Sequence, residues 1–346
     1  MDIKTSSVMS PKGDITLYTL TNAAGASVTL SSLGAGIVSI VVPDRNGVMA
    51  DVVLGYANAA DYLGDGPCAG KVPGRFANRI ANGRFVLDGE EYRLAINNGP
   101  NALHGGPEGF QNQIWNSAVT ADGAVEFSLV SPDGYEGYPG NLTVKATYSW
   151  NDACELSLTL EAETDAKTVV NLTNHVYFNL QGHNVGSMTG HKLWIKASRY
   201  LPTDDTQIPT GEFAPVAGTP MDFTRPTAIG RNMYAPFEAL KIGKGYDHCW
   251  VLDDCNGDLQ HVATLSDGVS GRSVEVSTTQ PGIQVYGGNW LEGCPAGKDG
   301  AVYHDYAAVA LECQGFPDAP NKPGFPSAVL EPGQKYKHII KFTFKQ

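Results

Sequence analysis

A histidine stands among amide side chains in residues 171–180, which read Asn-Leu-Thr-Asn-His-Val-Tyr-Phe-Asn-Leu. An imidazole can give or take a proton near neutral pH, and amides beside it can hold a polar ligand. Taken alone, His175 has a simpler interpretation as a satisfied strand histidine. Burying so many polar side chains on one strand is costly without a ligand or a hydrogen-bond network. We therefore interpret this strand-like stretch as part of a site for proton transfer on a hydroxylated substrate.

A carboxylate follows a second apolar run, residues 307–311, at Glu312. An unpaired carboxylate in a buried strand has a raised pKa, which is the usual way for an enzyme to make a base near neutral pH. The alternative is a side chain that reaches water at the end of the strand, and Glu312 alone does not decide between the two. Together with His175, it predicts an acid/base pair.

Polar side chains that could contact a ligand occur in four further segments. Asn78 and Arg79 lie in a glycine-rich stretch, and His104 precedes Gly-Gly. Arginine offers a planar fork of donors, and glycines let the backbone approach a ligand. Asp247 and Gln284 supply a carboxylate acceptor and an amide. Each signal is weak alone, because arginines commonly tie loops down.

Aromatic residues near these segments are candidates for stacking on a pyranose face, although such residues more often belong to the core. They are Tyr177, Phe178, Tyr246, Tyr286 and Trp290. The histidines lack the H-E-x-x-H and H-x-H spacings, so no metal site is predicted. Glycine-rich nucleotide motifs that follow a strand and open a helix are also missing.

Composition predicts a turn-rich β protein, because only 17% of the 346 residues are charged while glycine reaches 40 and proline 21. Short apolar or alternating runs bounded by turn residues favour an antiparallel β-sandwich over βαβ units. Residues 58–62 and 236–240 are short helical candidates. The predicted strands are 15–20, 27–33, 36–42, 51–54, 84–87, 124–130, 142–150, 155–161, 167–172, 192–195, 261–265, 273–277, 282–286, 307–311 and 338–344.

The chain contains no Ser/Gly-rich or Pro-rich linker, so we predict a single domain over residues 1–346. Long irregular segments at 99–113 and 200–231 are where a β scaffold would carry a binding site. The formal net charge of −12 argues against nucleic acid as a partner. The N-terminus lacks the apolar region of a signal peptide and no run is long enough for a membrane span, which predicts a soluble, cytoplasmic protein.

Several motifs together resemble the aldose 1-epimerase (galactose mutarotase) family. They run in the family's order over most of the chain, at residues 74–80, 103–106, 171–180, 245–248, 279–284 and 311–314. The match is specific, because separate motifs agree. The sequence departs from the family pattern at Cys249-Trp250 and at Lys71-Val72-Pro73. Neither departure touches a proposed proton-transfer residue, so they bear on sugar preference more than on the reaction.

The resemblance implies an all-β galactose mutarotase-like β supersandwich, mostly antiparallel with few short helices. It also implies interconversion of the α and β anomers of a free aldose, without a metal or an organic cofactor. By carry-over, Glu312 is the base that takes the proton from the anomeric O1, and His175 is the acid that protonates the ring O5. The ring then opens, and rotation about C1–C2 lets either anomer form. The residues assigned to the sugar hydroxyls are Asn78, Arg79, His104, Tyr177, Asp247 and Gln284.

Galactose and glucose are the expected substrates, and two other functions stay open. A hexose-6-phosphate 1-epimerase would need extra cations for the phosphate, and the motifs offer mainly Arg75 and Arg79. A carbohydrate-binding β-sandwich without catalysis is the second alternative, and the presence of both Glu312 and His175 argues against it. A monomer and a homodimer are both compatible with the sequence.

Overall fold

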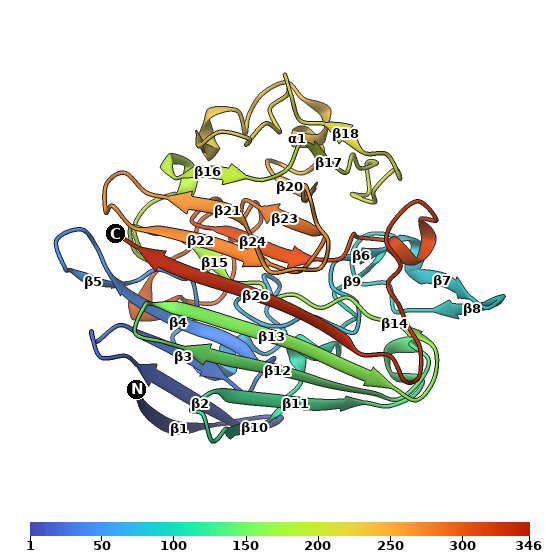
Figure 1. Cartoon of the computed structure of the whole chain (residues 1–346), viewed down its shortest axis with the longest axis horizontal. Helices are drawn as coiled ribbons and strands as arrows, with labels where there is room; N and C mark the ends of the chain where they lie inside the picture. Colours follow the sequence, from blue (N-terminus) through green and yellow to red (C-terminus); the bar gives the residue numbers. More distant parts are fainter.

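Apolar and polar residues alternate along the longest strands, as expected for sheets with one buried face. In β12 (Leu142–Trp150) and β13 (Glu155–Thr164), every second side chain is buried. These strands belong to a computed structural model that describes residues 1–346, shown in Figure 1. Every pairing between named strands is antiparallel, in agreement with the predicted fold class.

The largest sheet has nine strands in the order β10-β11-β12-β13-β26-β22-β21-β16-β19. It runs across the middle of Figure 1, with the C-terminal strand β26 at its centre. Its remaining strands are β10 (Asn116–Val119), β11 (Val125–Ser131), β16 (Lys192–Ile195), β19 (Thr227–Ala228), β21 (Gln260–Ser266), β22 (Ser273–Thr278) and β26 (Tyr336–Lys345).

Two further sheets pack against the nine-stranded sheet. The N-terminal sheet consists of β1 (Asp2–Ser10), β2 (Gly13–Thr21), β3 (Ser27–Ser31), β4 (Gly36–Pro43) and β5 (Met49–Asp51), in chain order. A six-stranded sheet has the order β15-β24-β23-β20-β17-β18. Its strands are β15 (Tyr177–Phe178), β17 (Arg199–Tyr200), β18 (Ala214–Pro215), β20 (Asp247–Val251), β23 (Gly282–Tyr286) and β24 (Val309–Gln314).

Short ladders and single turns of helix complete the chain. The ladders pair β6 (Arg79–Ile80) with β9 (Ala102–Leu103), β7 (Arg84–Leu87) with β8 (Glu90–Arg93), and β14 (Thr168–Val169) with β25 (Val329–Leu330). The one α-helix is α1 (Glu238–Ile242), and no helix has the length and apolar character to cross a membrane. The 3₁₀ turns are η1 (Ala59–Tyr62), η2 (Ala81–Gly83), η3 (Phe110–Asn112), η4 (Tyr135–Gly137), η5 (Met188–Gly190), η6 (Ile229–Arg231), η7 (Lys298–Gly300) and η8 (Ala319–Asn321).

One continuous hydrophobic cluster joins the three large sheets. Leu30 of β3 and Leu311 of β24 belong to the same cluster as Phe127, Leu158 and Phe342 of the nine-stranded sheet. β24 is buried along its whole length, which marks it as a core strand covered on both faces. This burial fixes the strand that carries Glu312.

The predicted strands at 142–150, 192–195 and 282–286 coincide with β12, β16 and β23. The prediction for residues 171–180 was wrong, because only β15 is a strand there and His175 lies in the irregular segment before it. The prediction for residues 167–172 was also too long, since β14 has two residues. The segment 58–62 forms η1, and α1 begins two residues later than the helix predicted at 236–240.

Candidate active site

The six-stranded sheet gathers several of the predicted site residues on one face. In the β24–β23 ladder Glu312 lies opposite Gln284, and in the β23–β20 ladder Tyr286 lies opposite Asp247. On the other side of β24, Tyr177 of β15 pairs with Ala310. Side chains directly opposite one another in a ladder, and those two residues apart, share a face. The register therefore brings Glu312, Asp247 and Tyr177 to the same side of the sheet.

His175 is held by the backbone of a distant segment. Its N–H donates to the carbonyl of Lys71 at 2.9 Å, and its carbonyl accepts from the N–H of Gly70 at 2.9 Å. Gly70 has φ +71°, and a Cβ there would lie 2.0 Å from the carbonyl oxygen of Ile37. Only glycine fits this close approach. The position of the imidazole thus depends on residue 70.

The amides around His175 have a structural role. Asn171 donates to the carbonyl of Ala77 at 3.0 Å, and Asn174 donates to that of Gly70 at 2.7 Å. Asn179 donates to the carbonyls of Val185 and Ala307 at 2.8 Å. Our interpretation of these amides as ligand-holding groups was therefore wrong. They satisfy backbone groups of buried irregular segments, which would otherwise lack partners.

A cavity of about 480 Å³ opens over this face of the sheet. A cavity of this size falls within the range of small-molecule sites. Its walls combine carboxylates, imidazoles, amides and a guanidinium with four hydrophobic side chains. The lining residues are Gly66, Pro67, Asn78, Arg79, Asn98, Leu103, His104, His175, Tyr177, Gln207, Asp247, Tyr286, Trp290 and Glu312.

His175 and Glu312 meet at the buried end of the cavity, 5% and 2% exposed. His175 Nε2 lies 3.5 Å from Glu312 Oε1, and Glu312 Oε2 accepts no hydrogen bond within the protein. Burial raises the pKa of Glu312 well above its usual value, and the Asp247 carboxylate raises it further. Burial also lowers the pKa of His175 to about 4. Between the lowered pKa of His175 and the raised pKa of Glu312, the pair therefore holds a single proton.

His104 is fixed as a neutral hydrogen-bond donor. Its Nδ1 accepts the backbone N–H of Asn78 at 3.1 Å, so the ring proton sits on Nε2. The backbone N–H of His104 donates to the carbonyl of Asn78 at 3.1 Å. Burial and the neighbouring His175 hold the pKa of His104 well below its usual value. Of the two histidines, whose ring centroids are 5.3 Å apart, His175 is thus the one placed to exchange a proton with Glu312.

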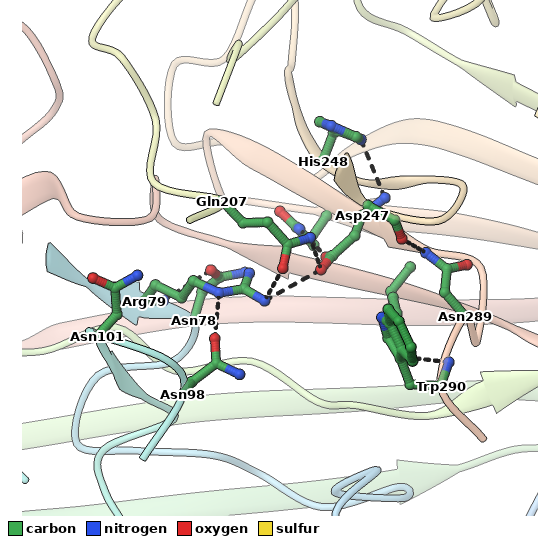
Figure 2. Close-up of polar contacts among 12 residues, drawn as sticks. Asn78, Arg79, Asn98, Asn101, Gln207, Asp247, His248, Asn289 and Trp290 are labelled. Atoms are coloured by element: carbon green, nitrogen blue, oxygen red, sulfur yellow. Dashed lines mark hydrogen bonds and ion pairs between the residues drawn. The ribbon is translucent and has the colours of Figure 1, made fainter. Parts of the chain in front are cut away.

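Arg79 and Asp247, which also line the cavity, form a charged network (Figure 2). Arg79 Nη2 lies 3.4 Å from Asp247 Oδ2, and Arg79 Nε donates to Asn98 Oδ1 at 2.9 Å. Gln284 Nε2 donates to Asp247 Oδ1 at 2.6 Å. Burial opposes ionisation of Asp247, but the Arg79 guanidinium and the hydrogen bond from Gln284 outweigh it and lower the pKa of the carboxyl. The wall therefore keeps one negative charge beside the acid/base pair.

The other predicted residues divide between the cavity and the core. Tyr177 lines the cavity, and its hydroxyl donates to the carbonyl of Pro67 at 2.8 Å. Gln284 is not part of the lining and stands behind Asp247. Of the predicted stacking residues Tyr286 and Trp290 reach the cavity, while Phe178 and Tyr246 belong to the core.

Sequence reasoning missed two polar side chains of the lining, Asn98 and Gln207. Both belong to irregular segments without a recognisable motif, so only the long loop predicted at 200–231 pointed toward Gln207. Arg75, by contrast, is buried away from the cavity and donates to the carbonyls of Pro139 and Gly140 at 2.6 and 2.9 Å. No group of three or more His, Cys, Asp or Glu side chains is arranged to hold a metal ion.

Comparison with known proteins connects this cavity to one family. The family model for aldose 1-epimerase matches residues 16–343. Galactose mutarotase of Sus scrofa is 47% identical over 317 residues, which is 92% of this chain and 90% of that protein. The human galactose mutarotase is 46% identical with the same coverage. Aldose 1-epimerase of Escherichia coli K12 is 39% identical over 95% of this chain and 94% of its own.

Solved structures share the fold over nearly the whole chain. An aldose epimerase homologue from C. elegans superposes with a TM-score of 0.87 at 29% identity, and each chain is covered to 99%. A galactose 1-epimerase from Lactobacillus acidophilus gives a TM-score of 0.85 at 28% identity, again with 99% of each chain covered. The fold is therefore the galactose mutarotase-like arrangement of antiparallel sheets, as the sequence motifs predicted.

Proposed function

The chain belongs to the aldose 1-epimerase family, and we propose that it interconverts the α and β anomers of free hexoses such as galactose with Glu312 and His175 as its acid/base pair. It is an isomerase of the mutarotase type. Action on a free hexose in the cytoplasm is part of the proposal.

One observation carries the assignment of the pair. Two titratable side chains, His175 and Glu312, lie 3.5 Å apart at the buried end of a single polar cavity. The anomeric O1 and the ring O5 of a pyranose are bonded to the same carbon, C1. A base and an acid this close together can each reach one of the two oxygens.

The proton count of the pair suits both directions of the reaction. In ring opening, Glu312 as carboxylate takes the O1 proton and His175 as imidazolium protonates O5, while the C1–O5 bond breaks and C1–O1 becomes a carbonyl. The pair is then neutral, with the proton on Glu312. After rotation about C1–C2, His175 takes the O5 proton, O5 attacks C1, and Glu312 returns a proton to O1. The pair thus alternates between two forms that both hold one proton.

Asp247 supports this cycle through its charge. The ionised Asp247 carboxylate raises the pKa of His175 and of Glu312, so it favours retention of the shared proton. Burial favours the neutral form of the pair, and the Asp247 charge favours the imidazolium. Burial is the larger of the two effects, since the pKa of His175 stays lowered, and the Asp247 charge offsets part of it.

Binding of the sugar falls to fixed groups that do not exchange protons. His104 Nε2–H is a donor, Asp247 is an acceptor, and Arg79 has its Nη1 free of hydrogen bonds within the protein. Asn78 and Tyr177 complete the predicted set in the cavity wall. Gln284 contributes by holding Asp247 from behind.

The cavity gives no support to a phosphorylated substrate. Arg79 is its only basic lining residue apart from histidine, and Arg79 is engaged with Asp247. Lys71 is buried in an ion pair with Asp65, and Arg75 donates to backbone carbonyls elsewhere. A phosphate prefers several free cationic donors. The free-hexose reading is therefore favoured.

Polarimetry on freshly dissolved α-D-galactose and α-D-glucose tests the proposal. The protein is expected to accelerate the approach to the equilibrium rotation, and a competing hexose 6-phosphate is expected to have little effect. A protein that binds sugar in calorimetry but leaves the rate at its spontaneous value would instead be a binding module. That result would contradict the proposal.

A further inference from the structure

Gln207 stands between the two charged residues of the cavity wall, as Figure 2 shows. Its Oε1 accepts from Arg79 Nη2 at 2.7 Å, and its Nε2 donates to Asp247 Oδ2 at 2.8 Å. The direct approach of the two charges is longer, at 3.4 Å, than a charge-assisted hydrogen bond. The Gln207 amide thus bridges Arg79 and Asp247 and takes the place of a close ion pair between them.

The loop that carries Gln207 is built to hold it. Asp204 Oδ1 accepts the backbone N–H groups of Thr206 and Ile208 at 2.8 and 3.0 Å. Gln207 N–H donates to the carbonyl of Asp204 at 3.0 Å, and Asn101 donates to that of Thr206 at 3.1 Å. Gln207 itself has φ +64°, a conformation that costs free energy for a residue with a side chain. The loop therefore maintains a strained backbone that directs this amide into the cavity.

A count of hydrogen bonds shows what the amide leaves available. Asp247 Oδ2 already accepts from Gln207 and Arg79, whereas Oδ1 accepts only from Gln284. Since a carboxylate oxygen can accept two hydrogen bonds, Oδ1 keeps one place for a sugar hydroxyl. Arg79 uses Nε and Nη2 within the protein and keeps Nη1. Arg79 Nη1 and one acceptor position of Asp247 Oδ1 thus stay available for the substrate, while the other polar atoms of these two side chains are hydrogen-bonded within the protein.

We propose that Gln207 is a positioning residue for sugar binding, because its amide keeps Arg79 and Asp247 from closing on each other and orients their free atoms toward the substrate. Without the amide, the guanidinium and the carboxylate can form a bidentate ion pair that uses the atoms needed by the sugar. The inference rests on the proposed mutarotase function. It predicts that the main effect is on substrate binding, because His175 and Glu312, which transfer the protons, make no hydrogen bond to Gln207.

The test compares Gln207→Met with the wild type in initial-rate polarimetry on α-D-galactose. Methionine has a similar length but cannot bridge the two charges. We expect KM to rise about tenfold or more, as for loss of a hydrogen bond to a charged group, with kcat changed by less than about twofold. Gln181→Met is the matched control. Gln181 Nε2 donates to Asp267 Oδ1 at 3.0 Å, and neither residue lines the cavity. The control is expected to keep the KM of the wild type.

A second variant, Gln207→Glu, separates positioning from mere stabilisation of the loop. An ionised carboxylate there still accepts from Arg79 but cannot donate to Asp247, whereas a protonated one can do both. Its KM is therefore expected to approach the wild-type value as the pH falls, while its melting temperature is recorded in parallel. An unchanged KM in Gln207→Met would overturn the inference. A raised KM accompanied by a fall in kcat of more than about twofold would also overturn it. An inactive wild type in the same assay would instead contradict the proposed function.

Discussion

Replacement of Glu312 by glutamine is expected to remove activity and to stabilise the folded protein at the same time. Glutamine keeps the size of the side chain but cannot take the O1 proton. A positioned general base contributes roughly 10²- to 10⁴-fold to the rate, which corresponds to about 3 to 5 kcal/mol of barrier. We therefore expect kcat to fall by about a thousandfold in polarimetry, with a much smaller change in KM.

The gain in stability follows from the raised pKa of Glu312. Above about pH 4.3 the unfolded chain releases this proton, while the folded protein retains it until its own raised pKa is reached. The folded wild type binds more protons than the unfolded state in this window, so its free energy of unfolding falls as the pH rises. The loss is about 1.4 kcal/mol per pH unit, and the Glu312→Gln variant lacks it.

Thermal unfolding of both proteins measures this difference. For a chain of 346 residues, 1.4 kcal/mol corresponds to a shift in Tm of about 2 °C. The variant should therefore gain about 2 °C on the wild type for each unit by which the pH is raised from about 4.3 toward the raised pKa of Glu312. Glu163→Gln, at an exposed carboxylate, is the control and should show no such trend. A constant Tm difference across the pH range, or a kcat within tenfold of the wild type, would refute the reasoning.

Three further predictions concern His104, the pH profile of kcat, and Arg75. His104→Phe should raise KM for galactose about tenfold without moving the pH limits of kcat, because His104 is a neutral donor; a shifted pH profile would assign it a proton-transfer role. The pH profile of kcat should be bell-shaped, falling below the lowered pKa of His175, about 4, and above the raised pKa of Glu312. Arg75→Lys should cost about 2 to 3 kcal/mol of stability in denaturant unfolding at unchanged KM, since five donor contacts of its guanidinium to buried oxygens cannot all be made by one ammonium.

Strong periodicity made the core strands predictable from sequence. β12, β16 and β23 have the predicted bounds, because their apolar residues recur as a half-buried or buried strand requires. β1 was missed, since its residues are nearly all exposed and offer no buried face. β20 was also missed, because its residues Asp-His-Cys-Trp-Val mix site residues with core residues.

The site was predictable to the extent that its residues lie in recognisable motifs. His175, Glu312 and the motif residues Asn78, Arg79 and His104 do line one cavity, although their roles stay predictions. Gln207 could not be found, because its contacts depend on how a loop between β17 and β18 folds back over Arg79. The amides around His175 did not indicate a ligand, since amide side chains can bind buried backbone groups as well as a ligand.

The acid/base pair and much of the remaining cavity wall come from different elements of the fold, and this bears on how sugar specificity can change. Glu312 lies on β24, and the His175 segment runs directly into β15, which is hydrogen-bonded to β24 through Tyr177 and Phe178. Arg79, Asn98 and Gln207 come instead from short ladders and loops. Under the proposed assignment, mutation of the loops would change which sugar is accepted and leave Glu312 and His175 in place. A change in sugar specificity would then not require a change in the catalytic pair.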